Sequence, residues 1–374
     1  AVGRGHESSI KRLIRAGAPA DARAADGQTP HGAALARGRR DLAEWLDWSG
    51  WKLPGRALQH GDLPAAAMAG DLGAVVRLIA LGLPVDALDP QGCTALLRAA
   101  GGGHLALVEH LLGLHANHAL AARTGATPLS AAISMRHAAV VDRLLAAGAD
   151  PEQPMPGGVT PLMLASALGL PDLVSRLLRA GAAVDARDAQ GLTPLHCAAL
   201  FAFTSRDRAR VLALFDTLLL ADADADAASS AEQTPTLLVL GARAEAGVSV
   251  DEDVLHAALD RLLSEGVSLS HVEHRGLTAL HLAALHGMGR IVERLLREGA
   301  DPAARDRLGR TPHDLALIRG FVDIAALFQA PRAEANGRRE AGERIDASGV
   351  ASSSASSASS ASPSLARLLR PRDP

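Results

Sequence analysis

A 33-residue interval between short threonine motifs constrains this chain more than any other feature of its sequence. The interval separates the members of two groups: Thr94-Ala95, Thr127-Pro128, Thr160-Pro161 and Thr193-Pro194, then Thr278-Ala279 and Thr311-Pro312. Upstream, Thr29-Pro30 begins another unit, and a weaker one around Leu63 keeps the same register. Self-similarity at a fixed period of roughly 20–50 residues indicates a repeat array, in which each unit packs only on its neighbours.

Each unit carries the local signals of a helix pair. A glycine such as Gly191 supplies the positive φ of a tight turn, and the Thr-Pro pair that follows is suited to begin a helix. A second glycine such as Gly169 ends this first helix. Apolar residues then recur at helical spacing until an exit such as Gly148-Ala149-Asp150. The repeat therefore predicts a helix–turn–helix unit followed by a short extended loop.

The composition favours helices. Hydrophobic residues make up 48% of the chain, but aromatic residues make up only 2%. The interior must therefore be built from Ala, Leu and Val. Such residues suit closely packed helices better than broad β-sandwiches.

The repeat resembles the ankyrin repeat. The motif Thr-Pro-Leu-His-x-Ala-Ala of that family appears almost whole at 193–199, and its Gly-His pair appears at Gly103-His104. The resemblance covers about residues 5 to 330. It implies a mainly α fold, an ankyrin-repeat α-solenoid of stacked helix–turn–helix units whose β-hairpin loops project at right angles.

We expect this array to occupy residues 1–330, with about nine units and a partial one at the N-terminus. A disordered tail is expected over residues 331–374, because the nearly pure Ser and Ala run at 351–364 cannot bury enough surface to offset chain entropy. The half unit at the start and an opening Ala1 in place of Met predict a fragment of a longer chain. The bias toward Ala, Gly and Arg suggests a GC-rich genome, and we expect a bacterial source.

The period breaks between about residues 200 and 262. One insertion of eight residues lies near 201–210, and another of eleven lies near 243–253. Insertions in repeat arrays form loops on one face, often the binding face, but neutral drift of a surface loop explains them as well. The acidic run at 222–226 is expected to be a solvated loop. For Trp45, Trp48 and Trp51, core packing is favoured over an exposed aromatic patch.

No motif predicts catalysis, a cofactor or a metal. The chain has no Cys-x-x-Cys, no His-Glu-x-x-His and no phosphate-binding loop. The spacing of His110, His115 and His118 matches no zinc pattern. The family resemblance gives His196 and His281 a structural role. We therefore expect a protein that is not an enzyme and that needs no cofactor.

The resemblance also implies where a partner protein binds, namely at the hairpin tips and at the ends of the first helices. The residues in these slots include Leu308 and Ile318. From the slots we single out thirteen contact residues: Met135, Val159, Leu168, Gln190, Leu192, Leu200, Phe201, Arg275, Leu277, His286, Arg307, Arg310 and Arg319. The middle of the set is apolar and its C-terminal part is cationic, which predicts a partner with an apolar segment and an acidic end. The alternative is that the insertion near 201–210 covers the apolar members and that they are core.

Charge, hydropathy and cysteine content bear on two further questions, namely which other classes of partner the chain could bind and where in the cell it acts. A net charge of −3, from 38 basic and 41 acidic residues, gives no general drive toward nucleic acid or anionic membrane. No uncharged apolar run reaches the roughly 18 residues that span a bilayer. The two cysteines, Cys93 and Cys197, favour a reducing compartment, so we expect a cytoplasmic monomer. Two other functions stay open: the recognition arm of a larger enzyme or membrane protein, and a translocated bacterial effector.

Overall fold

The computed structural model describes residues 6–48, 50–245, 248 and 250–329. The chain divides into two units, and every helix reported below belongs to the first, Ala1–Gln329. The disordered tail predicted for residues 331–374 lies outside the described residues.

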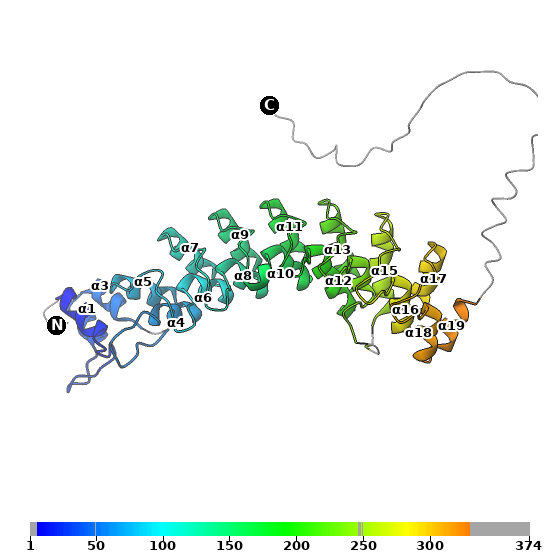
Figure 1. Cartoon of the computed structure of the whole chain (residues 1–374). Helices are drawn as coiled ribbons and strands as arrows, with labels where there is room; N and C mark the ends of the chain where they lie inside the picture. Colours follow the sequence, from blue (N-terminus) through cyan, green and yellow to red (C-terminus); the bar gives the residue numbers. More distant parts are fainter. Residues whose placement is uncertain (1–5, 49, 246–247, 249, 330–374) are drawn as a thin grey trace, which may run out of the picture. The chain divides into compact units, whose positions relative to one another are not determined.

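A single helix, α1 (Glu7–Arg15), is followed by nine helix pairs in the part of the chain that the structure describes. The pairs are α2 (Pro30–Leu35) with α3 (Arg40–Leu46), α4 (Asp62–Met68) with α5 (Leu72–Ala80), α6 (Ala95–Gly102) with α7 (Leu105–Gly113), α8 (Pro128–Ser134) with α9 (Ala138–Ala146), α10 (Pro161–Ala167) with α11 (Pro171–Arg179), α12 (Pro194–Thr204) with α13 (Arg208–Leu219), α14 (Pro235–Val239) with α15 (Glu252–Leu263), α16 (Ala279–His286) with α17 (Gly289–Arg297), and α18 (Pro312–Ile318) with α19 (Val322–Leu327). Figure 1 shows successive pairs of the first unit side by side.

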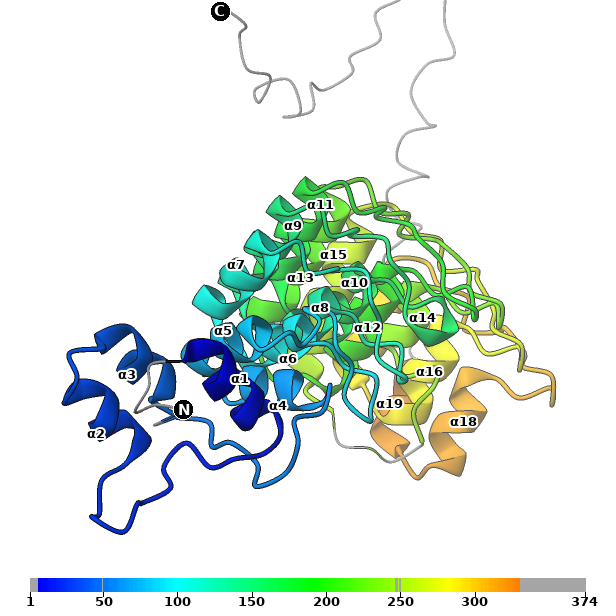
Figure 2. The same ribbon diagram turned by 90° about the vertical axis from the view of Figure 1, so that its left-hand side faces the viewer.

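The pairs form two layers of helices. First helices contact first helices along the series α4, α6, α8, α10, α12 and α14, and second helices contact second helices from α7 through α17. Figure 2 shows the two layers nearly end-on, with α7, α9 and α11 in one and α8, α10 and α12 in the other. Each helix therefore buries one face on its own pair and another on the next. This arrangement confirms the predicted mainly α solenoid.

The threonine motif begins the first helices as predicted. The Thr94 hydroxyl accepts a hydrogen bond from the backbone N–H of Leu97 at 3.1 Å, and Thr127 accepts one from Ser130 at the same distance. Glycine ends α6 and α16, where Gly103 and Gly287 adopt a left-handed backbone. Local chemistry therefore sets the bounds of these helices.

The core is built mainly of small and aliphatic side chains. The alanine pair Ala198 and Ala199 of α12 is fully buried, as is the pair Ala283 and Ala284 of α16. Small side chains let neighbouring first helices approach closely. Phe215 is the largest fully buried side chain among the described residues.

The loops between pairs differ from the expected β-hairpins. No β-strand forms in the described residues, and an isolated antiparallel bridge joins Met155 to Val159. A typical tip is closed by one backbone bond, from the N–H of Asp188 to the carbonyl of Leu192 at 3.0 Å. The Asp188 carboxylate accepts the N–H groups of Gln190 and Leu192 within the same turn, at 2.8 Å each. Within the described residues, no further backbone bond joins the two arms of this tip beyond the pair Asp188 and Leu192, so the tip is a turn and not a β-hairpin.

The two insertions have different structures. The one near 201–210 lengthens helices, since α12 runs to Thr204 and α13 begins at Arg208. It is therefore not the loop that was expected. The one near 243–253 lies between α14 and α15, and its residues 246, 247 and 249 lie outside the described residues.

The acidic run at 222–226 forms the exit of its unit. Asp226 accepts the backbone N–H of Ser268 at 2.9 Å, and the N–H of Asp224 donates to Asp185 at 3.1 Å. Asp222 has a φ of +63°, in the slot that glycine fills at Gly148. The run thus connects neighbouring units and is more than a solvated loop.

The three tryptophans pack on one another and on the core. The ring centres of Trp45 and Trp48 lie 6.4 Å apart, and those of Trp48 and Trp51 lie 6.3 Å apart. All three are partly buried against the main core, which supports the favoured prediction.

Candidate partner-binding surface

The loop tips lie in a row, and backbone hydrogen bonds join several neighbouring tips. The backbone N–H of Arg123 donates to the carbonyl of Gln91 at 3.1 Å, and that of Ser230 donates to Gln190 at 2.9 Å. At the C-terminal end, Arg307 donates in the same way to Arg275 at 3.1 Å. These bonds fix the spacing of neighbouring tips, so the side chains on the tips are held at set positions.

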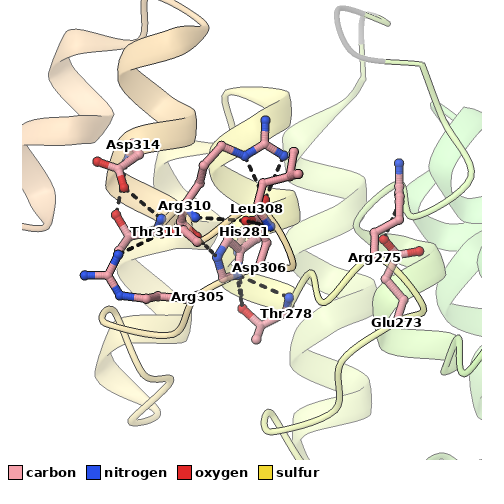
Figure 3. A network of polar contacts seen from close by, with 11 residues as sticks. Glu273, Arg275, Thr278, His281, Arg305, Asp306, Leu308, Arg310, Thr311 and Asp314 are labelled. Atoms are coloured by element: carbon pink, nitrogen blue, oxygen red, sulfur yellow. Dashed lines mark hydrogen bonds and ion pairs between the residues drawn. The ribbon is translucent and has the colours of Figure 1, made fainter.

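Buried carboxylates hold the shape of the tips. In the last loop, Asp306 accepts the N–H groups of Leu308 and Arg310 at 2.9 Å each, and the Arg310 guanidinium at 2.8 Å (Figure 3). Burial alone raises the pKa of Asp306, but these hydrogen bonds outweigh it and hold that pKa below its ordinary value. The ionised carboxylate is therefore a fixed part of the turn.

Histidines join the first helices to the next loop. His281 Nδ1 accepts the backbone N–H of Thr278 at 3.2 Å, and its Nε2 donates to the carbonyl of Arg310 at 3.1 Å (Figure 3). His196 does the same between Thr193 and Gln233, at 3.1 and 2.9 Å. Both positions require a neutral imidazole with its proton on Nε2, and burial lowers the pKa of each. Their role in this geometry is structural.

The structure separates the thirteen predicted contact residues by exposure. Five are exposed: Met135, Gln190, Arg275, Arg307 and Arg319. Five are half-buried: Val159, Leu168, Leu200, Phe201 and Arg310.

Three of the predicted contact residues are buried, and their assignment to the surface is wrong. Leu192 is 5% exposed, Leu277 is 4% exposed and His286 is 9% exposed. Leu192 and Leu277 each follow a turn glycine, and their side chains are buried beneath the loop. His286 lies against the Phe203 ring, with ring centres 5.6 Å apart, and its Nε2 donates to the carbonyl of Gly241 at 3.2 Å.

The apolar patch expected in the middle of the array is largely covered. The Phe201 ring packs on Gly169 so closely that a Cβ there would lie 2.2 Å from it. Arg210, from the inserted segment, lies over that ring with its guanidinium carbon 5.1 Å from the ring centre, and it donates to the carbonyl of Leu168 at 2.8 Å. The geometry therefore favours the alternative in which the insertion covers these residues.

A pocket of about 500 Å³ lies at the C-terminal end of the row, and we call it the C-terminal cup. Its lining is His274, Arg275, Leu277, Leu285, Asp306, Arg307, Leu308, Arg310, Leu315 and Ile318. Leu308 is 74% exposed and Ile318 is 65% exposed, so the cup presents apolar surface to solvent. The family resemblance selects both residues, Leu308 as a tip residue and Ile318 as the end of a first helix, although neither was among the thirteen singled out.

The four predicted arginines differ in whether the guanidinium group already has a partner. Arg275 bonds Glu273 at 2.5 Å and the carbonyl of Ala242 at 2.9 Å, and Arg310 bonds Asp306. Among the described residues, the guanidinium groups of Arg307 and Arg319 have no hydrogen-bond or ion-pair partner. Of the four, only Arg307 and Arg319 offer unpaired charge to a ligand.

A search of the described residues for other kinds of site gave two negative findings. It found no group of three or more His, Cys, Asp and Glu side chains placed to hold a metal ion. None of the described helices is both long and apolar enough to cross a membrane.

Comparison with known proteins identifies the repeat. A family model described as ankyrin repeats in three copies matches residues 63–155 and 249–338, and a model of the single ankyrin repeat matches residues 157–189. Together these matches cover more than half of the chain.

Two curated proteins share parts of the array. Human neurogenic locus notch homolog protein 1 is 34% identical over 90 residues, which is 24% of this chain and 3% of that protein. Human protein phosphatase 1 regulatory subunit 27 is 44% identical over 59 residues, which is 16% of this chain and 38% of that protein, and its mouse counterpart matches equally. The chain thus spans well under two thirds of either relative.

Proposed function

Because the chain belongs to the ankyrin-repeat family, we propose that it binds another protein through its loop tips and the ends of its first helices. Ankyrin repeats generally mediate protein–protein interaction. The observation that carries the proposal is the bonded row of tips, which holds exposed and unpaired side chains such as Gln190 and Arg307 at fixed positions. A preorganised surface loses little conformational freedom on binding.

The proposed partner has an acidic portion that lies against the C-terminal units. Arg307 and Arg319 carry unpaired charge there, and charge complementarity directs orientation and increases the association rate. Of the apolar contacts expected in the middle of the array, Met135 is the most exposed, at 60%, while Val159, Leu168, Leu200 and Phe201 are half-buried. We further propose that the chain acts without catalysis, as a cytoplasmic monomer that binds protein and not nucleic acid.

The test is binding of a captured partner by wild-type and variant chains. The surface variant combines Met135→Ser, Gln190→Ala and Arg307→Glu, all at exposed positions. Its control combines Glu109→Ala and Arg297→Glu, exposed residues on the second helices α7 and α17. A partner isolated from the source cell and then purified should bind the surface variant about tenfold or more weakly, and the control as tightly as wild type. Equal binding to the surface variant would place the contact elsewhere and refute the proposal.

Phe201 is a poor choice for this test. Its ring fills the space against Gly169, so a Phe201→Ser change would alter the fold together with the surface.

A second function is favoured by one observation, the 44% identity to a protein named as a phosphatase regulatory subunit. It is the role of recognition arm for an enzyme, with this chain presenting a target to a separate catalytic subunit. If the purified partner is an enzyme, its activity should change when the chain is added, and the surface variant should abolish the change. If the chain changes the activity of no captured enzyme, the recognition-arm function is refuted and the scaffold function is the one that remains.

A further inference from the structure

Building on the proposed function, we propose that the C-terminal cup binds a short segment in which one large aliphatic or aromatic side chain is flanked directly by carboxylates. The apolar and acidic contacts of the partner then lie within one segment, instead of being spread along the array. The cup is formed by the tips before α16 and α18 together with the ends of these two helices.

The floor of the cup is apolar and open. Leu308 on the last tip and Ile318 at the end of α18 are mostly exposed, and Leu285 at the end of α16 is half-buried. Leu277 and Leu315 also line the cup and are buried. The volume of about 500 Å³ accommodates a side chain of leucine or phenylalanine size. Burying one such side chain corresponds to roughly a tenfold to hundredfold gain in affinity.

The unpaired charge at the rim is positive. The two carboxylates of the loops, Glu273 and Asp306, are buried and already neutralised by Arg275 and Arg310 (Figure 3). Arg307 has no such partner among the described residues and is exposed at the mouth of the cup. A carboxylate beside the inserted apolar side chain meets this charge, whereas a lysine or arginine there is repelled.

The rim is rigid before any ligand arrives. The N–H of Arg307 bonds the carbonyl of Arg275, and His281 bonds the carbonyl of Arg310, so both neighbouring tips are tied in place. Rigid placement of charge and apolar floor in one pocket favours a specific short motif over a diffuse acidic surface.

The test is a selection of random peptides displayed on phage against the full chain. Three immobilised proteins are compared: wild type, a cup variant with Arg307→Glu and Leu308→Ser, and a control variant with Arg123→Glu and Leu220→Ser. All four positions are exposed, so each variant keeps its buried core, and circular dichroism checks the fold. The control makes the same charge reversal and the same kind of apolar loss at positions outside the cup.

Wild type and control should both enrich peptides that carry Leu, Ile or Phe with Asp or Glu within two positions. Synthetic versions of these peptides should bind the cup variant at least about tenfold more weakly, and their binding to wild type should weaken as salt rises. Enriched peptides that bind the cup variant as tightly as wild type would overturn the cup and leave the proposed function intact. Failure to enrich any such peptide would also overturn the cup proposal, whereas the proposed function is decided by the captured-partner test.

Light scattering at the same protein concentration tests whether a second copy of the chain occupies the cup. A dimer of the wild type that the cup variant abolishes would show that a second copy of the chain fills the cup, and would overturn the peptide proposal. A monomer in all three proteins is the expected result.

Discussion

At the scale of single residues, polar groups in the interior keep neighbouring units in register. His196 and His281 each accept one backbone N–H and donate to a backbone carbonyl of the next loop, and His286 donates to the carbonyl of Gly241. A proton added to Nδ1 of His196 would remove its bond from Thr193. The array is therefore stabilised by imidazoles that must stay neutral.

These histidines predict a loss of stability in mild acid. Burial lowers the pKa of His196, His281 and His286 in the folded chain, whereas an unfolded imidazole titrates near 6.5. The unfolded chain therefore takes up protons first as pH falls. The contribution of these neutral histidines to the free energy of unfolding is therefore complete above about pH 6.5 and declines below it. Urea unfolding followed from pH 8 to pH 5 should show the midpoint falling.

The control is His196→Met, since Met163 occupies the same slot in its own unit. This variant should be less stable than wild type at pH 8, because the bond to Gln233 is lost, but its midpoint should fall less between pH 8 and pH 5. A fall as steep as in wild type would show that other groups cause the acid sensitivity.

At the scale of elements, the longer helices α12 and α13 replace the usual packing between units. The ring of Phe201 and the guanidinium of Arg210 cover the glycine turn of the preceding unit. Elsewhere a histidine serves at this turn, as His137 does when its Nε2 donates to the carbonyl of Gly101 at 3.1 Å. The insertion thus changes which side chain covers the glycine turn. The stacking of the helices stays the same.

This packing predicts that Gly169→Ala is costly. The added Cβ would lie 2.2 Å from the Phe201 ring, and the φ of +62° disfavours any side chain. Gly181→Ala is the matched control, with a φ of +93° and no atom within 4 Å. Gly169→Ala should lower the free energy of unfolding by about 1–3 kcal/mol more than the control does, because it adds overpacking to the same backbone strain. Equal losses in urea unfolding would mean that Phe201 does not seal the turn.

At the scale of the whole first unit, the helix pairs depend on their nearest neighbours. α9 contacts α7 and α11, whereas α17 contacts α15 and α19. In such an array, stability is approximately a sum of unit terms and neighbour interfaces. Damage to one pair should therefore spread to the adjacent pairs and fade beyond them.

Hydrogen exchange with mass spectrometry tests this locality. Leu144→Ala removes a fully buried side chain of α9 and should cost about 2–5 kcal/mol locally. Amide protection should fall in α7, α9 and α11 and stay near wild type in α17. Leu295→Ala in α17 should give the converse pattern around α15 and α19. A uniform loss along the array in both variants would contradict the neighbour rule.

The sequence by itself determined the repeat and the helices. Thr193-Pro194 caps and starts a helix through contacts within a few residues, and Gly103 and Gly287 end helices through their own backbone freedom. Such signals are local, so a single unit is enough to read them. Their 33-residue recurrence then required stacking, because one unit cannot bury its own apolar face.

Only the tertiary structure decided which side chains face a partner. Leu192 and Arg310 each follow a turn glycine, yet Leu192 is buried and Arg310 is half-buried. Phe201 is covered by Arg210, and the charge of Arg310 is neutralised by Asp306 while that of Arg307 is not. Burial and pairing depend on atoms from other units and on the direction of each side chain within its turn. A motif places residues at the tips and helix ends but records neither, and for that reason the structure was needed to show which residues of the cup are open and unpaired.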